Sequence, residues 1–245
     1  MTDQILKDSF RFLTLLVSAV CLYACQGEEV NKSAQSVIIN DSLLAANFYQ
    51  KSYDISNANP DSAIYYAKKS LTISKSSRNR RQTANAFAQI AYPYAMQSQY
   101  DSAIFYFQHA ADIYFEIKDT NRYLTVVNNQ GGMYVQNSQF DKALQVLSET
   151  KNIALKNDLE VHVADAYANL GLMEDYKGNI DSSLYYYKTA LRYAEKAEDS
   201  LRYMKTYNNI GIMFYYAEEH RKAIPYFQAA ATYNKSKTNN SQLID

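Results

Sequence analysis

This 245-residue chain has no tryptophan, only two cysteines and three histidines, and no net charge, because 25 basic residues balance 25 acidic ones. A neutral chain without a lysine- or arginine-rich run lacks the basic surface with which proteins bind nucleic acids. The histidines, His109, His162 and His220, are far apart in sequence, and no His-Glu-x-x-His or Cys-x-x-Cys spacing occurs. We therefore expect three separate surface histidines, no metal or other cofactor, and no enzymatic activity.

Both cysteines lie within the first 25 residues, so the rest of the chain can form no disulfide. Lys7 and Arg11 precede an apolar run of 13 residues from Phe12 to Ala24. This run is shorter than the roughly 20 residues that span a bilayer as a helix. A signal peptide over residues 1–24 is predicted.

The end of this leader, Leu22-Tyr23-Ala24-Cys25, resembles the bacterial lipobox, in which the cysteine receives lipid before the leader is removed. The resemblance implies that Cys25 is lipidated and that the protein is lipid-anchored in the bacterial cell envelope, on the periplasmic face or the cell surface. Acyl chains contribute about 0.8 kcal/mol per buried CH₂, so several chains anchor a protein stably. An ordinary secretory leader with a free Cys25 is the alternative.

Residues 25–41 are polar and cannot bury enough apolar area to offset the entropy of ordering them. We predict a flexible tether there. The acidic residues Glu28 and Glu29 resemble the export tag of surface lipoproteins in Bacteroidetes-type bacteria.

A small residue recurs every 40 residues after this tether, at Ala63, Ala103, Ala143, Ser183 and Ala223. A fixed period between 20 and 50 residues indicates stacked supersecondary units rather than one closed core. A large residue follows each small one by four positions in most repeats, on the same helical face. Asp61, Asp101, Asp141 and Asp181 stand two places before the small residue, where a carboxylate can accept hydrogen bonds from the backbone N–H groups that open a helix.

A second pattern precedes each of these helices, as in Phe87-x-x-Ile90-Ala91-x-x-Tyr94 and Tyr207-x-x-Ile210-Gly211-x-x-Phe214. Large, large, small and large residues at helical spacing predict an apolar ridge with a notch for a crossing helix. Each repeat is thus predicted to be a helical hairpin. The two patterns together resemble the tetratricopeptide repeat (TPR) family.

The resemblance implies an all-α fold, a right-handed α-solenoid of about five TPR-like hairpins. Its 40-residue period is similar to the long-helix variant of kinesin light chains and bacterial peptide-sensing regulators. The predicted repeats are a divergent first one at 42–80, then 81–120, 121–160, 161–200 and 201–240.

Tyrosine is the strongest compositional bias, with 24 residues. Tyr66, Tyr106, Tyr186 and Tyr226 share one repeat position and are predicted to pack between adjacent helices. Three others lie off the buried ridge of first helices, which line the inner groove in this family. They are candidate exposed contacts to a partner: Tyr92, Tyr215 and Tyr216.

Amide side chains also recur at intervals of 40, in the middle of the first helices. Asparagine is a mediocre helix former, so its recurrence there requires another explanation. Either the amides bind the main chain of an extended partner, as the resemblance implies, or they bind neighbouring repeats. These candidate partner-binding residues are Gln89, Asn129, Asn169 and Asn209, with Asn128 and Asn208 beside them. Lys205 adds a candidate cationic contact.

The sequence therefore predicts a non-catalytic, envelope-anchored scaffold that binds a peptide or protein partner in its concave groove. It contacts the membrane only through the lipid and binds no nucleic acid. Two alternatives stay open: the sensor or input portion of a truncated signalling or transcriptional regulator, and a glycan-binding surface lipoprotein that uses exposed tyrosines.

Overall fold

The computed structural model describes residues 40–241, and the side chains up to residue 232. The predicted signal peptide, Cys25 and nearly all of the predicted tether lie outside these residues. A helix over residues 40–55 is followed by α2 (Pro60–Ser76), α3 (Arg80–Met96), α4 (Tyr100–Glu116), α5 (Thr120–Gln136), α6 (Phe140–Lys156), α7 (Glu160–Tyr176), α8 (Ile180–Lys196), α9 (Ser200–Tyr216) and α10 (His220–Ser241). Residues 40–241 contain no strand.

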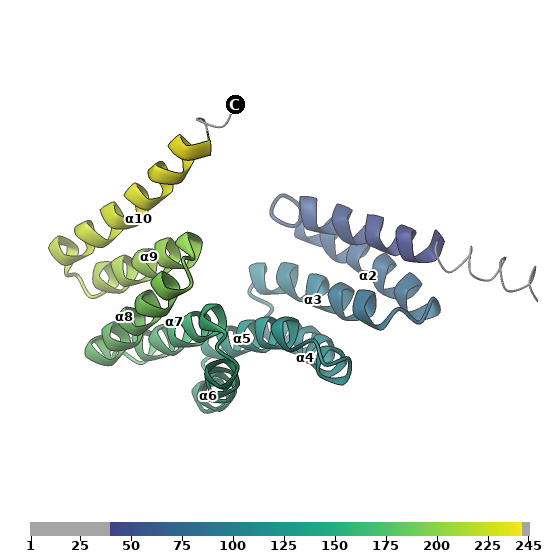
Figure 1. The fold of residues 1–245 in the computed structure, drawn as a ribbon, viewed down its shortest axis with the longest axis horizontal. Helices are drawn as coiled ribbons and strands as arrows, with labels where there is room; N and C mark the ends of the chain where they lie inside the picture. Colours follow the sequence, from purple (N-terminus) through teal and green to yellow (C-terminus); the bar gives the residue numbers. More distant parts are fainter. Residues whose placement is uncertain (1–39, 242–245) are drawn as a thin grey trace, which may run out of the picture.

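The helices pair into five hairpins that stack along the chain, which confirms the predicted all-α solenoid. We call the first helix of each hairpin the inner helix and the second the outer helix. The inner helices α5, α7 and α9 pack against one another in order. Figure 1 shows α3, α5, α7 and α9 along the concave side of the solenoid, with α4, α6 and α8 farther out. The hairpins begin at residues 40, 80, 120, 160 and 200, one or two residues before the predicted starts.

The turns explain the regular period. The helices from α2 to α9 have 17 residues each, and three-residue turns separate them. The middle residue of each three-residue turn from α2 to α10 has a positive φ, between 52° and 77°, at Arg78, Ser98, Lys118, Ser138, Asp158, Gly178, Glu198 and Glu218. In the turn after α4, the Lys118 N–H donates to the Phe115 carbonyl and the Asp119 N–H to the Tyr114 carbonyl. This is the Schellman motif, which ends a helix through a left-handed residue.

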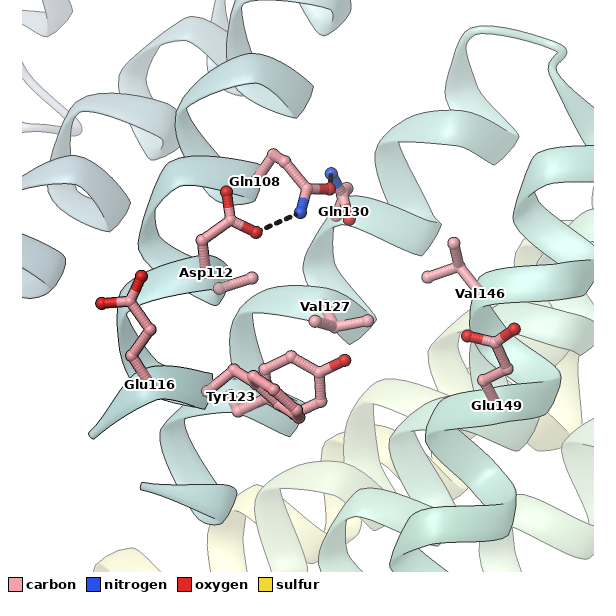
Figure 2. A pocket seen from close by; sticks show the side chains of 10 residues that line it. Gln108, Asp112, Glu116, Tyr123, Val127, Gln130, Val146 and Glu149 are labelled. Carbon is pink, nitrogen blue, oxygen red and sulfur yellow. Dashed lines mark hydrogen bonds between the residues drawn. The ribbon is translucent and has the colours of Figure 1, made fainter. Parts of the chain in front are cut away.

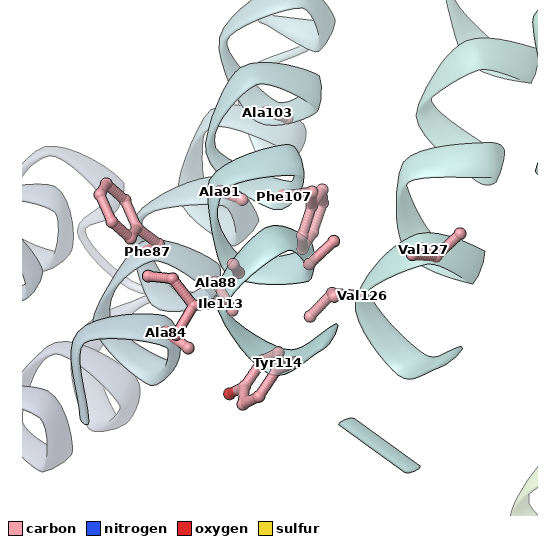
Figure 3. Packing of buried hydrophobic residues seen from close by; sticks show 12 residues of the cluster. Ala84, Phe87, Ala88, Ala91, Ala103, Phe107, Ile113, Tyr114, Val126 and Val127 are labelled. Atoms are coloured by element: carbon pink, nitrogen blue, oxygen red, sulfur yellow. The ribbon is translucent and has the colours of Figure 1, made fainter. Parts of the chain in front are cut away.

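The predicted notch is confirmed in the packing of inner on outer helices. A Cβ atom placed on Gly171 would lie 2.8 Å from the ring of Tyr187, and one on Gly211 would lie 2.7 Å from the ring of Phe227. Ala91 and Phe107 occupy the same two positions in the second hairpin and belong to one buried cluster (Figure 3). A small residue on the inner helix thus lets a large side chain of the outer helix approach the backbone.

The recurrent tyrosines pack as predicted. Tyr106 is half-buried and stacks on Tyr94 of the preceding inner helix at 5.5 Å between ring centroids, and Tyr226 stacks on Phe214 at 5.6 Å. The first-turn aspartates behave differently from the prediction, because Asp61 and Asp101 accept hydrogen bonds from side-chain amides of the next hairpin. No helix within residues 40–241 has the length and apolar character needed to span a bilayer.

Candidate functional site

Two hollows open on the inner helices. The first, which we call the N-terminal hollow, has a volume of about 900 Å³ and is lined mainly by the first two hairpins, with Lys205 of α9. The second, the C-terminal hollow, has a volume of about 530 Å³ and lies on α5, α7 and α9. Its lining residues are Gln136, Leu172, Asp175, Tyr176, Tyr187, Asn209, Ile212 and Tyr216.

The 40-residue register explains this lining. Gln136, Tyr176 and Tyr216 occupy one position in three successive inner helices, and Leu172 and Ile212 occupy another. Four positions on the inner helices therefore form the groove, and the side chains at these positions differ from one repeat to the next. The groove can have a different chemistry at each end.

The first three amides of the predicted series bind the preceding repeat. The Gln89 amide donates to the Ser52 hydroxyl at 3.3 Å, and the Asn129 amide donates to the Tyr92 hydroxyl at 2.9 Å. Each acceptor lies 37 residues before its donor. At the corresponding place before Asn169 stands Gly132, which has no side chain, and the Asn169 amide donates to the Asn128 carbonyl at 3.1 Å instead.

Asn209 ends this series without a partner. The residue 37 positions earlier is Leu172, which has no hydrogen-bonding group. Within the described residues, no hydrogen bond involves the Asn209 side chain, which lines the C-terminal hollow. Of the two explanations for the amide series, binding between repeats therefore accounts for three members, and Asn209 stays available to a ligand.

The other predicted partner-binding residues differ in how far they are exposed to a ligand. Gln89 and Asn128 are only 2% and 5% exposed, so a ligand could reach their amides only by displacing neighbouring side chains. Asn208 is exposed but lines neither hollow. Tyr216 is 78% exposed and lines the C-terminal hollow, while Tyr215 beside it is exposed and packs near His220.

Tyr92 lines the N-terminal hollow with part of its ring exposed. Its hydroxyl is surrounded by protein, and this burial raises the pKa of Tyr92 to about 12, helped by the nearby hydroxyls of Tyr49 and Tyr114. The hydroxyl therefore stays neutral and accepts the bond from Asn129. Tyr92 joins two repeats as well as facing the groove.

Asp175 is the main feature of the C-terminal hollow that the sequence reasoning missed. Its carboxylate takes part in no ion pair or hydrogen bond within residues 40–241, and burial raises its pKa. The adjacent Glu174 differs, because it accepts from Lys177 at 2.9 Å and from Asn179 at 2.6 Å. The register carried a signal, since the equivalent residues in the two preceding inner helices are Ala95 and Val135.

Tyr187 forms the floor of the same hollow from α8. Its side chain is fully buried against Gly171, and its hydroxyl has no hydrogen-bond partner in the described part of the chain. Burial raises the pKa of Tyr187 far above its ordinary range, and the Asp175 carboxylate contributes to this shift. The hydroxyl is therefore neutral and lies beneath the hollow close to the Ser183 side chain.

A third hollow, of about 590 Å³, lies between the outer helices α4 and α6 (Figure 2). Three carboxylates line it, and each already has a partner. Asp112 accepts from Gln108 at 2.7 Å, Glu149 accepts from Gln145 at 3.4 Å, and Glu116 pairs with Arg80. Gln130, which replaces an apolar ridge residue, reaches the same hollow and donates to the Gln108 amide oxygen.

The histidines do not all lie on the surface as predicted. His162 is buried, and its Nε2 lies 3.3 Å from Asn121 Oδ1, because the first turn of α7 packs against α5. Burial lowers the pKa of His162, so the ring is neutral. Among the described residues, no three His, Cys, Asp or Glu side chains gather where they could hold a metal ion.

The sequence comparisons match part of the chain. The family model of the tetratricopeptide repeat matches residues 162–236, from the first turn of α7 to the last part of α10. No match was found among curated proteins.

Solved structures share the fold over a longer stretch. Aspartyl phosphate phosphatase F from Bacillus subtilis matches 79% of this chain with a TM-score of 0.62 and 15% identity, and this chain covers 60% of that protein. A Rap protein complexed with Competence and Sporulation Factor matches 79% of this chain with a TM-score of 0.67 and 19% identity, over 56% of that protein. A putative kinesin light chain from Podosopora anserina with nearly identical TPR-like repeats matches 80% of this chain with a TM-score of 0.56 and 11% identity, and this chain covers 97% of that protein. The chain thus has a TPR-like fold and spans about 60% of the length of the Bacillus phosphatase.

Proposed function

We propose that this protein is a non-catalytic scaffold that binds a peptide or protein segment along its concave groove, and that lipid on Cys25 anchors it to the bacterial cell envelope. One observation carries the binding proposal. The C-terminal hollow presents an amide and a carboxylate that have no intramolecular partner within residues 40–241, beside exposed aromatic rings. Polar groups left unpaired at a half-buried site gain most when a ligand supplies the missing hydrogen bonds.

The shape of the fold supports the same proposal. An extended segment can follow the inner helices and contact several repeats at once, as solenoid grooves allow. A solved structure with a similar fold was determined with Competence and Sporulation Factor bound to a Rap protein. Asn209 and the exposed tyrosines Tyr92 and Tyr216 provide polar and aromatic contacts to such a segment.

A pooled library of random ten-residue peptides, applied to the purified full-length protein, tests the proposal. Asn209→Ala and Tyr216→Ala remove groups from the groove, and we expect each to lower the retained peptide several-fold. Tyr185→Ala is the matched control, because Tyr185 is also largely exposed but lies on the outer helix α8. Retention of no peptide, or equal losses in all three variants, would contradict groove binding. Binding of oligosaccharides in place of peptides would favour the glycan-binding alternative.

The anchoring part has its own test. In cells fed labelled palmitate, the protein is expected to carry label and to sediment with membranes, whereas the Cys25→Ser variant loses the label. An unlabelled wild-type protein would refute the lipid anchor without affecting the groove.

A further inference from the structure

We propose that the C-terminal hollow is a subsite for one cationic side chain, lysine or arginine, of the bound segment. This inference rests on the proposed function, because it names which residue of a groove ligand the hollow receives. The negative charge of Asp175, the rings of Tyr176 and Tyr216, and the Asn209 amide, which makes no hydrogen bond within residues 40–241, meet there.

The charge of the hollow is not balanced within the protein. Asp175 is the only charged residue among the side chains that line it, and no ion pair in residues 40–241 involves this carboxylate. Leu172 and Ile212 lie beside it and offer no hydrogen bond. A half-buried carboxylate in such surroundings favours a neighbouring cation, which restores the electrostatic stabilisation that burial removes. The raised pKa of Asp175 reflects this deficit.

Aromatic rings border the same space. Tyr176 and Tyr216 are 48% and 78% exposed, and both line the hollow. The Tyr176 hydroxyl donates to the Gln136 side-chain oxygen at 2.5 Å, which fixes the position of its ring. Ring faces attract ammonium and guanidinium groups, with arginine used more often than lysine.

One further group can accept an N–H donor from the cation. The Tyr187 hydroxyl beneath the floor is fully buried, so a ligand could reach it only by displacing neighbouring side chains. The Asn209 side chain makes no hydrogen bond within the described residues, so its amide oxygen can accept from the cation. Leu172, at the position that Ser52 and Tyr92 occupy in the first two repeats, leaves the amide N–H group free as well. An arginine offers five donors and a lysine three, so either can bind the carboxylate and the Asn209 oxygen together.

The other hollows lack this combination. The N-terminal hollow contains Lys205 as well as Asp54, so its charges balance. The hollow between α4 and α6 has more carboxylates, but each is already paired or hydrogen-bonded. An unpaired carboxylate beside exposed rings occurs, among the three hollows described, only in the C-terminal one.

Four pools of peptides test the subsite. Each pool has random flanks and one fixed central residue: arginine, lysine, glutamine or glutamate. With purified full-length protein, we expect the arginine and lysine pools to bind at least about fivefold more tightly than the glutamine pool, and the glutamate pool most weakly. Asp175→Asn should remove the difference between the arginine and glutamine pools. Asp141→Asn removes the same charge from the exposed first turn of α6 and should keep the difference.

The ring contribution has a separate variant pair. Tyr216→Leu should weaken the arginine pool by about two- to fivefold, while Tyr216→Phe keeps the ring face and the affinity. Thermal unfolding accompanies every variant, and Asp175→Asn should unfold no earlier than wild type because it removes a charge that burial disfavours. If Asp175→Asn is unfolded, the comparison of Tyr216→Leu with Tyr216→Phe on the arginine pool decides whether the cation binds in this hollow.

The outcomes separate the two proposals. If all four pools bind wild type equally, the groove binds peptides and the cationic subsite is refuted. If the preference for arginine survives Asp175→Asn, the cation binds elsewhere and the assignment to this hollow is wrong. If no pool binds, the proposed function fails together with the subsite.

Discussion

Repeats two to four and repeat five carry amides at one register position but use them differently. Asn129 binds Tyr92 in the preceding repeat, whereas Asn209 faces the C-terminal hollow without a partner. The difference arises at the residue 37 positions earlier, which is Tyr92 in one case and Leu172 in the other. In a solenoid, the role of a groove residue is therefore set by its neighbour in the previous repeat as much as by its own type.

The largest expected effect comes from the floor of the C-terminal hollow. Gly171→Ala should lower the free energy of unfolding by about 2 kcal/mol, because the new Cβ would lie 2.8 Å from the Tyr187 ring. Gly132→Ala is the control in the preceding inner helix, one register position further on, where the nearest atom is 3.4 Å away. It should raise stability by up to about 1 kcal/mol, since alanine favours a helix over glycine. Urea unfolding measures both, and equal effects would show that the close packing at Gly171 is unimportant.

The next effect separates the two amides directly. Asn129→Ala should cost about 1 kcal/mol because it removes the bond to the Tyr92 hydroxyl. Asn209→Ala should cost nothing, since no intramolecular bond within the described residues is lost and alanine is the better helix former. A double-mutant cycle with Tyr92→Phe should show coupling for Asn129 and none for Asn209. Equal losses of stability from the two alanine variants would remove the contrast between the repeats.

The turns have the same backbone geometry in repeats two to four and in repeat five. Variants of the turns therefore test how much the backbone, rather than the groove side chains, contributes to stability in these repeats. Gly178→Ala, in a turn where a new Cβ meets no atom within 4 Å, should lower stability by about 1 kcal/mol through its positive φ alone. Lys118→Gly should raise stability by a similar or smaller amount. Thermal unfolding measures both, and a neutral Gly178→Ala would show that these turns tolerate any residue.

The smallest effect is a pH dependence at Asp175. Its pKa is raised in the folded protein above that of the unfolded chain, so the folded state binds more protons between the two values. Stability from this group is therefore present at low pH and is lost as pH rises through the folded pKa. We expect the stability of Asp175→Asn relative to wild type to rise as pH increases above 3.8, the ordinary pKa of the carboxyl, and to level off once the folded carboxyl is ionised, as measured by urea unfolding. A stability difference that is constant with pH would contradict the raised pKa.

The sequence predicted the features that repeat. Helical hairpins, the notch at Gly171 and the half-buried Tyr106 follow from periodicity, because packing at those positions repeats with the chain. The hydrogen-bond partner of each amide could not be predicted from the sequence. Each partner lies 37 residues before its amide, and this separation depends on how the hairpins stack. Asp175 did not follow from the periodicity, because it does not recur: the equivalent residue of the previous repeat is the apolar Val135. His162 was wrongly placed on the surface for a similar reason, as burial at the start of an inner helix requires knowledge of the adjacent helix.

Lys205 of the last hairpin lines the N-terminal hollow together with Tyr53 and Asp54, although about 150 residues of chain separate them. The superhelix has therefore turned far enough for its two ends to face each other across one space. A molecule that fills this space would contact both ends of the spiral and resist its stretching. The mechanical stiffness of the protein would then depend on what occupies this space, even though the helices of the described chain pack mainly in sequence along the spiral.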